Sequence, residues 1–117
     1  NFEQTMDNLN TFDNFEPFTK EEFAAVAKAK ELFDARVQVP CTGCRYCMPC
    51  PFGVNIPRCF RVLNDSHIYN QMENGRKQYA SMDGKAELCQ KCGACMVECP
   101  QNIQIPDMLE KVTEQLG

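Results

Sequence analysis

Two runs of closely spaced cysteines hold the residues best suited to chemistry in this sequence. Two residues separate successive cysteines throughout the first run, whereas the second run has three residues before its last cysteine. The runs are Cys41, Cys44, Cys47 and Cys50, followed by Pro51, and Cys89, Cys92, Cys95 and Cys99, followed by Pro100. The second spacing is that of bacterial ferredoxins, so the sequence predicts two [4Fe–4S] clusters.

The fourth cysteine of each run is expected to bind the cluster of the other run. Three cysteines with this spacing can wrap three corners of one cube, whereas the fourth precedes a stiff proline and leads away. The spacing before Cys50 is one residue shorter than that before Cys99, which leaves Cys50 less chain for reaching the opposite cluster. We assign the first cluster to Cys41, Cys44, Cys47 and Cys99, and the second to Cys89, Cys92, Cys95 and Cys50.

Structural zinc is the alternative interpretation of the same cysteines. Zinc binds four thiolates from paired Cys-x2-Cys motifs, and eight thiolates could fill two such sites. The third cysteine of each triplet would then be surplus, which favours iron–sulfur clusters. A sample purified in air could hold Zn²⁺ or no metal, whatever the native cofactor is.

Small and apolar residues within the runs fit a cluster-binding loop. Gly43, Gly93 and Ala94 allow backbone amides to approach the inorganic sulfides and donate hydrogen bonds to them. Met48 and Met96 each follow the third cysteine of a run. We expect both methionines to line the clusters.

Four other residues could be given functional roles, but a structural or solvent-exposed role explains each of them more simply. Arg45 and Lys91 are expected to be solvated loop charges, with attraction of an acidic or phosphate-bearing partner as the alternative. Cys59, the ninth cysteine, is expected to be a small buried hydrophobic residue. His67, the single histidine, falls near the end of an expected helix and is expected to be a surface or capping residue rather than a ligand.

An internal repeat contains both runs. Residues 50–57 are matched 49 positions later by residues 99–106, since both segments open with Cys-Pro and close with Ile-Pro. Gly53 aligns with Asn102, and these two residue types most readily adopt a left-handed backbone. The repeat covers residues 41–64 and 89–113, which predicts a module with pseudo-twofold symmetry.

Helices must position these runs. Pro57 and Pro106 suit the first position of a helix, and each is followed by apolar residues at helical spacing. One face of the first helix is marked by Phe60, Leu63 and Asn64, and one face of the second by Leu109, Val112 and Leu116. Between the repeats we expect turns at Asn74-Gly75 and Asp83-Gly84, with short helices near residues 76–81 and before Cys89. No segment alternates like a strand, so the fold class is mainly α, an α-helical ferredoxin-like dicluster module preceded by an N-terminal helix.

The first 40 residues contain no cysteine. A polar stretch with four phenylalanines comes first, and Thr19 with Glu22 then forms a capping-box signature. Phe18 is placed to pack on Phe23 across this cap. We expect an amphipathic helix over about residues 20–36, docked by its apolar stripe. The predicted domains are therefore residues 1–40, a connector and helix, and residues 41–117, the dicluster domain.

Composition narrows the class of protein. The nine cysteines are odd in number and densely clustered, which suits metal in a reducing, cytoplasmic environment better than disulfides. The net charge of −4 argues against nucleic acid, and no apolar run is long enough for a membrane. Because the first residue is not Met, a removed signal stays an open alternative. No catalytic constellation is visible, so this segment alone is not predicted to be an enzyme.

The sequence resembles the C-terminal 4Fe–4S dicluster domain of the iron–sulfur aldo/keto reductases. The resemblance is carried by the first run, residues 41–51, and by Ile56-Pro57. The likeness extends over nearly the whole chain, and the short first spacing is similar too. The resemblance implies that the eight cysteines of the runs are the cluster ligands. It also implies an N-terminal (β/α)8 barrel that binds NAD(P) and bears the catalytic residues; no part of that barrel lies in this sequence.

Three functions are compatible with the sequence. The first is a one-electron relay through two clusters, between an external electron donor and the reductase barrel of the same parent chain. The second is a structural domain stapled by iron–sulfur clusters or zinc, for folding or oligomer contacts. The third is a separate ferredoxin-like subunit of a larger complex. We favour the relay, because one cluster would suffice as a staple.

Overall fold

The computed structural model describes residues 1–13 and 15–117. Its described residues form helices and connecting loops and contain no strand, which confirms the mainly α prediction. The chain divides into two compact units, Asn1–Leu32 and Phe33–Gly117, called here the N-terminal unit and the cysteine-rich unit.

The N-terminal unit begins with a helix that the sequence analysis missed. Helix α1 covers Phe2–Asp13. The Asn1 side chain caps it by accepting a hydrogen bond from the Gln4 amide at 3.0 Å, and the terminal amine donates to Gln4 Oε1 at 3.1 Å. Phe2, Met6 and Leu9 recur at helical spacing in this segment, a signal that its many polar residues obscured, and none of its side chains is buried.

Helix α2, Lys20–Asp34, has the predicted cap. The Glu22 amide donates to Thr19 Oγ1 at 3.2 Å, and the Thr19 amide donates to Glu22 Oε2 at 2.9 Å. The hydrogen bond from the Thr19 amide lowers the pKa of Glu22. The Phe18 and Phe23 rings meet edge to face with centroids 6.5 Å apart, which confirms the predicted contact. The helix ends two residues before the predicted limit.

The predicted docking of α2 by its apolar stripe stays a prediction, since the stripe is exposed in the described residues. None of its side chains is buried, and Phe23 and Val26 are 67% and 53% exposed. Local interactions support the helix instead: the capping box, the Phe18–Phe23 contact and the Lys28–Glu31 ion pair at 2.9 Å.

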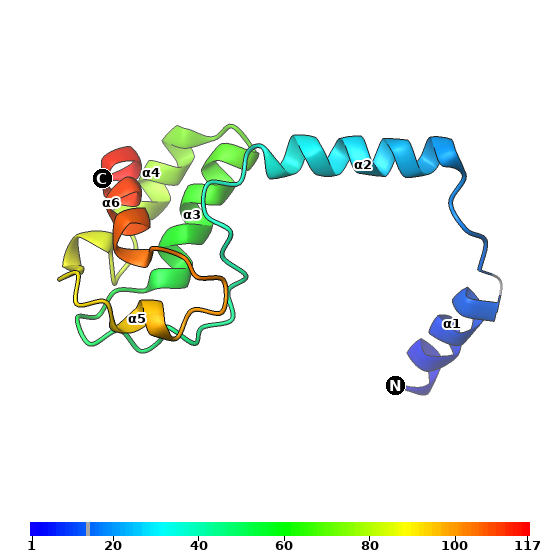
Figure 1. Ribbon diagram of the computed structural model, residues 1–117, viewed down its shortest axis with the longest axis horizontal. Coiled ribbons are helices and arrows are strands. Elements are labelled where there is room, and N and C mark those ends of the chain that lie inside the picture. Colours follow the sequence, from blue (N-terminus) through cyan, green and yellow to red (C-terminus); the bar gives the residue numbers. More distant parts are fainter. Residues whose placement is uncertain (14) are drawn as a thin grey trace. The chain divides into compact units, whose positions relative to one another are not determined.

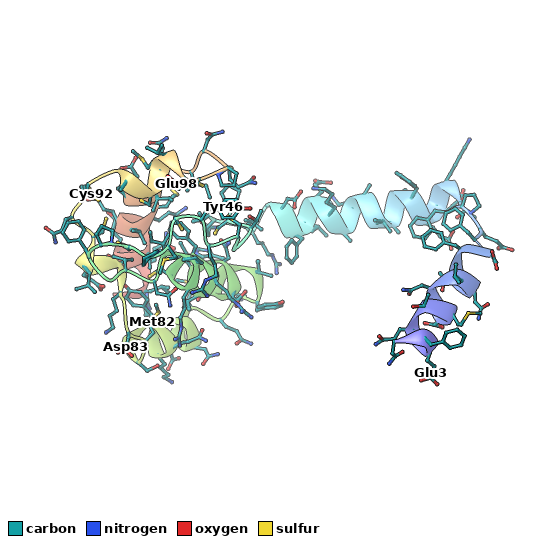
Figure 2. The ribbon with its side chains drawn as sticks, turned by 90° about the horizontal axis from the view of Figure 1, so that it is seen from below. Glu3, Tyr46, Met82, Asp83, Cys92 and Glu98 are labelled. Atoms are coloured by element: carbon teal, nitrogen blue, oxygen red, sulfur yellow. The ribbon has the colours of Figure 1, made fainter. Side chains whose placement is uncertain are left out.

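Three packed helices form the body of the cysteine-rich unit. They are α3 (Ile56–Ile68), α4 (Met72–Ala80) and α6 (Ile105–Leu116), and each contacts the other two (Figure 1). The short helices are η1 (Ala86–Leu88), which packs on α6, and α5 (Ala94–Val97) within the second cysteine run. Cys92 and Glu98 lie on the opposite side of this unit from Met82 and Asp83 (Figure 2).

The predicted apolar faces of the two repeat helices form the core. Phe60 and Leu63 of α3, and Leu109, Val112 and Leu116 of α6, are all buried. Pro57 and Pro106 take the second helical position rather than the first, since the helices begin at Ile56 and Ile105. Either position is suitable, because the first amides of a helix have no partner within it.

Asn64 ties the start of the first cysteine run to α3. Its Oδ1 accepts hydrogen bonds from the Gln38 and Val39 amides at 2.9 and 3.0 Å, and its Nδ2 donates to the Val39 carbonyl at 2.8 Å. Val39 is fully buried two residues before Cys41. Asn64 therefore fixes the chain entering the run.

The segment between the repeats differs from the prediction at one turn. Gly84 has a φ of +68° and its carbonyl accepts from the Asn55 amide at 2.7 Å, which confirms the Asp83-Gly84 turn. Asn74 and Gly75 instead lie inside α4, so the turn expected there is wrong. The helices expected near residues 76–81 and before Cys89 are confirmed as the C-terminal part of α4 and as η1.

Candidate metal centre

The two cysteine runs repeat one backbone conformation. Left-handed residues occur two and four positions after the first cysteine of each run, and again three positions after the last cysteine. The pairs are Gly43 and Lys91 (φ +70° and +53°), Arg45 and Gly93 (+69° and +78°), and Gly53 and Asn102 (+78° and +52°). The last pair confirms the prediction made from the repeat. Such turns can direct successive backbone amides into one concave site, which favours the binding of anions. A site of this kind suits the sulfides of an iron–sulfur cluster.

The extra residue of the second run is accommodated by one additional turn. In both runs an equivalent bond closes the loop, from Met48 N to Arg45 O at 2.9 Å and from Met96 N to Gly93 O at 3.0 Å. Only the second run adds a bond from Cys99 N to Met96 O, at 3.2 Å, as α5 continues. The first run proceeds through a cis Met48–Pro49 peptide.

Each predicted set of four cysteines lines one cavity. A cavity of about 20 Å³ is lined by Cys41, Cys44, Cys47 and Cys99. A larger one, of about 340 Å³, is lined by Cys50, Cys89, Cys92 and Cys95. The fourth cysteine of each run therefore lies beside the first three of the other run. Cys47 and Ile56 line both cavities, which are consequently adjacent.

The donor chemistry fits iron–sulfur clusters. Each cavity is lined by its predicted set of four thiols, with Cys47 also lining the larger one, and Cys44 and Cys92 are the exposed members of their sets. The smaller cavity has room for little more than a water molecule in this structure. No three His, Cys, Asp or Glu side chains in the described part of the chain are arranged to hold a single metal ion.

Burial keeps the innermost thiols protonated. It is the main reason that the pKa of Cys47 rises from 9.0 to about 11, with smaller contributions from the neighbouring thiols of Cys41 and Cys95. Burial likewise raises the pKa of Cys95, with Cys89 contributing through its charge. Metal or cluster binding at neutral pH must therefore displace protons from these thiols.

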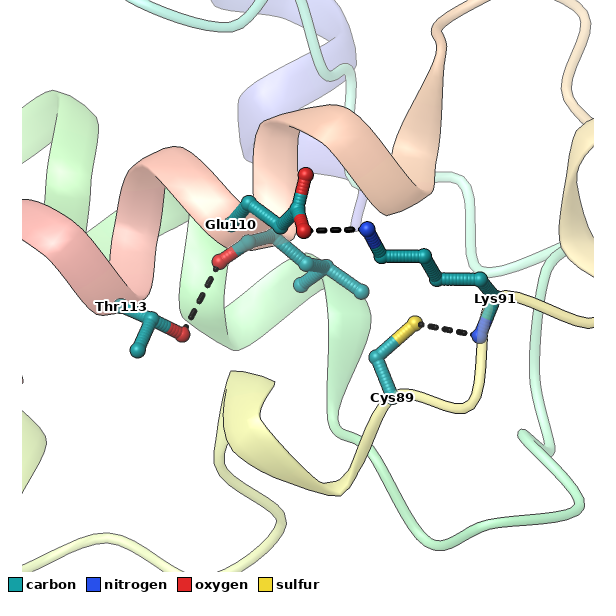
Figure 3. A network of polar contacts seen from close by, with 5 residues as sticks. Cys89, Lys91, Glu110 and Thr113 are labelled. Carbon is teal, nitrogen blue, oxygen red and sulfur yellow. Dashed lines mark hydrogen bonds and ion pairs between the residues drawn. The ribbon is translucent and has the colours of Figure 1, made fainter.

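Lys91 connects the second cysteine loop to α6. Its amide donates to Cys89 Sγ at 3.4 Å, and its ammonium group forms an ion pair with Glu110 (Figure 3). The hydrogen bond with Glu110 raises the pKa of Lys91. Lys91 is exposed, as expected, but it is also paired. No local pattern in the sequence indicates this pair, because its members lie 19 positions apart.

The remaining residues singled out from the sequence have structural roles. Cys59 is fully buried, as predicted, and its Sγ lies 3.6 Å from the Gly84 carbonyl oxygen. His67 is half-buried near the end of α3 and hydrogen-bonded to Gln115 at 2.7 Å, rather than at the surface or capping the helix. Met48 lines the larger cavity, whereas Met96 lines neither cavity in the described part of the chain.

Tyr79 positions the second run but was missed from the sequence. Its buried hydroxyl accepts a hydrogen bond from the Ala86 amide at 2.8 Å and donates to Glu87 at 2.6 Å. These bonds fix η1, and the Cys89 amide in turn donates to the Ala86 carbonyl at 3.0 Å. A single tyrosine between Gln78 and Ala80 belongs to no sequence pattern that would indicate this role.

Comparison with protein families gives one match. A family model described as 4Fe-4S dicluster domain matches residues 40–104, a segment that includes both cysteine runs. Comparisons with curated proteins and with solved structures give no match. Of the helices in the described residues, none has both the length and the apolar character needed to cross a bilayer.

Proposed function

Because the chain belongs to the 4Fe-4S dicluster domain family, we propose that it relays single electrons through two [4Fe–4S] clusters to an aldo/keto reductase-type barrel of the same parent protein. An iron–sulfur electron-transfer role follows from the family itself. A bound cluster supplies a one-electron carrier whose potential depends on hydrogen bonds and solvent exposure around it. The number of clusters, their ligands and the barrel belong to the proposal.

The adjacency of the two cavities is the main support for a relay. Each cavity has the four thiols that one cubane requires, and Cys47 lines both. Two redox centres that share a wall can exchange electrons within the domain. A module that only stapled the fold would need one metal site, and nothing would require the two sites to adjoin.

The crossed arrangement also supports a single cooperative unit. Cys99 lies beside the first run and Cys50 beside the second, so each proposed cluster would bind thiols from both loops. We propose that both clusters bind in this manner, with the ligand sets predicted from the sequence. The chain's own residues then provide the thiolates, the inward amides and the apolar wall of Ile56.

The N-terminal unit supports a covalent link to a further domain. Its helices α1 and α2 expose aromatic side chains along their length, including Phe2, Phe12 and Phe23. Exposed apolar surface of this kind commonly marks a contact with another protein surface. Together with the resemblance to the iron–sulfur aldo/keto reductases, this supports a parent protein in which the barrel binds NAD(P) and performs the chemistry.

Anaerobic analysis of the purified chain tests the proposal. Iron, sulfide and zinc would be measured after anaerobic reconstitution, and the EPR spectrum recorded after dithionite reduction. We expect about eight irons with matching sulfide and a reduced spectrum broadened by coupling between two spins. About two zinc ions per chain, without sulfide and without cluster formation, would instead support a structural metal-stapled domain.

A further inference from the structure

The pseudo-twofold repeat produces two equivalent surface grooves. The first groove has a volume of about 860 Å³, and the second a volume of about 440 Å³. Six positions of the second groove are the repeat counterparts of positions in the first. Cys41, Gly43, Pro57, Arg61, Asn64 and Asp65 line the first, and Cys89, Lys91, Pro106, Glu110, Thr113 and Glu114 the second.

The charges of the two grooves are opposite. Three arginines, Arg45, Arg58 and Arg61, line the first groove with a single carboxylate, Asp65. Three glutamates line the second groove with a single cation, Lys91, which is itself paired with Glu110. The most direct contrast is between repeat counterparts, since Arg61 of α3 corresponds to Glu110 of α6.

The arginines of the first groove are available to a partner. Arg58 and Arg61 lie three positions apart on α3 and therefore on one face. Both are exposed, and Arg61 makes only a 3.6 Å contact with Asp65. Arg45 and Arg58 have no ion-pair partner in the described part of the chain.

Compensation for the negative charge of a cluster does not explain this basic groove. Each cavity has its own set of four cysteines, and both sets would bind the same anionic group. The second groove is nevertheless acidic. The charge difference between the two grooves therefore has another cause, and a binding partner that contacts the first groove would account for it.

The first groove adjoins the smaller cysteine cavity. Cys41, Thr42, Arg45 and Pro57 line both. A protein seated in the groove would thus lie against the loop that holds the proposed first cluster, where electron transfer over a short distance is possible.

We propose that the first groove is the docking surface for an acidic electron-carrier protein, and that electrons enter the domain through the first cluster. This inference rests on the proposed function. One electron passes from the reduced carrier to the oxidised cluster, so the carrier is oxidised, the cluster is reduced and no covalent bond changes. Complementary charge accelerates such encounters and makes them sensitive to salt.

Stopped-flow reduction of the reconstituted full chain tests the docking surface. The probe is a reduced plant-type [2Fe–2S] ferredoxin, an acidic carrier, at low and at high ionic strength. We expect the double substitution Arg58→Glu with Arg61→Glu to slow reduction at least tenfold at low salt. High salt should slow the unsubstituted chain and should bring the two rates together.

A matched control changes the same charge elsewhere. Lys28→Glu with Lys30→Glu alters two cations of α2, in the N-terminal unit, and should leave the rate within twofold. Dithionite needs no docking surface and should reduce all three proteins equally. Failure of dithionite reduction would therefore contradict the proposed function, whereas equal ferredoxin rates in the two double variants would contradict only the docking surface. Tight binding of inorganic pyrophosphate at Arg58 and Arg61, with an unchanged ferredoxin rate in their variant, would assign the groove to a small anion and overturn the inference.

Discussion

Gly75 of α4 lies directly against Ser66 of α3. A Cβ added at Gly75 would be 1.8 Å from Ser66 Oγ and 2.9 Å from Ser66 Cβ. Both residues are buried, and the Ser66 hydroxyl donates to the Val62 carbonyl at 2.6 Å. The close approach of two helices therefore requires glycine at this position, although Gly75 has an ordinary helical backbone.

Gly75→Ala should destabilise the folded chain. Overlap with Ser66 forces the helices apart, and overpacking of this kind costs about 1–3 kcal/mol. Ser66→Ala should recover part of the loss in the double variant, because it removes the nearest atom. Anaerobic thermal unfolding measures both effects, and Asn74→Ala is the neighbouring control. Equal stability of Gly75→Ala and the parent chain would refute the proposed packing role.

Tyr79→Phe should weaken the segment before the second cysteine run. The substitution leaves the buried Ala86 amide without its acceptor, and an unsatisfied buried group costs about 1–3 kcal/mol. Unfolding under anaerobic conditions and the rate of iron release to a chelator would both report the change. Tyr69→Phe is the control, since that ring is 66% exposed. The role assigned to Tyr79 fails if the two variants behave alike.

Cys59 should resist alkylation in the folded chain. Burial raises its pKa from the ordinary 9.0 to about 12, so the reactive thiolate is scarce at pH 8. Iodoacetamide labelling of the metal-free chain, followed by mass spectrometry, should modify exposed Cys44 first and Cys59 only in guanidinium. Because the folded state keeps this proton to about pH 12 and the unfolded state loses it near pH 9.0, burial of Cys59 lowers stability as pH rises between these values. Early labelling of Cys59 would contradict its buried position.

Glu110→Gln should raise the reduction potential of the second cluster. The substitution removes a negative charge near Cys89 and frees the cation of Lys91, so the added electron is less disfavoured. Both side chains are more than half exposed, so an effect of about 10–40 mV is expected. An EPR-monitored redox titration measures it, with Glu73→Gln of the exposed Lys77–Glu73 pair as control. A shift to lower potential would contradict the assigned electrostatics.

The helical class and the repeat were predictable because local signals determine them. The Ile-Pro starts, the apolar spacing after Pro57 and Pro106, and the Thr19–Glu22 cap all act within a few residues. The turn expected at Asn74-Gly75 failed because packing against Ser66, which is distant in sequence from α4, decides that glycine's role. Docking of α2 could not be judged from its pattern, since an apolar stripe does not reveal what it contacts.

The cysteine sets were predictable because spacing and the Cys-Pro repeat restrict which thiols can meet. In the structure each set lines one cavity, with Cys47 also lining the other, and the assignment of clusters to these sets stays a prediction. Three features had no local signal: the hydrogen bonds of Tyr79, the Lys91–Glu110 pair and the opposite charges of the two grooves. All three arise from residues that only tertiary packing brings together.

Iron content of two double variants tests the crossed ligand sets most directly. In the proposed arrangement, Cys41→Ala and Cys99→Ala affect the same cluster, whereas Cys41→Ala and Cys50→Ala affect different ones. After anaerobic reconstitution, the Cys41→Ala, Cys99→Ala variant should retain about four irons per chain, and the Cys41→Ala, Cys50→Ala variant close to none. The reverse result would show that each run binds its own cluster and would contradict the account.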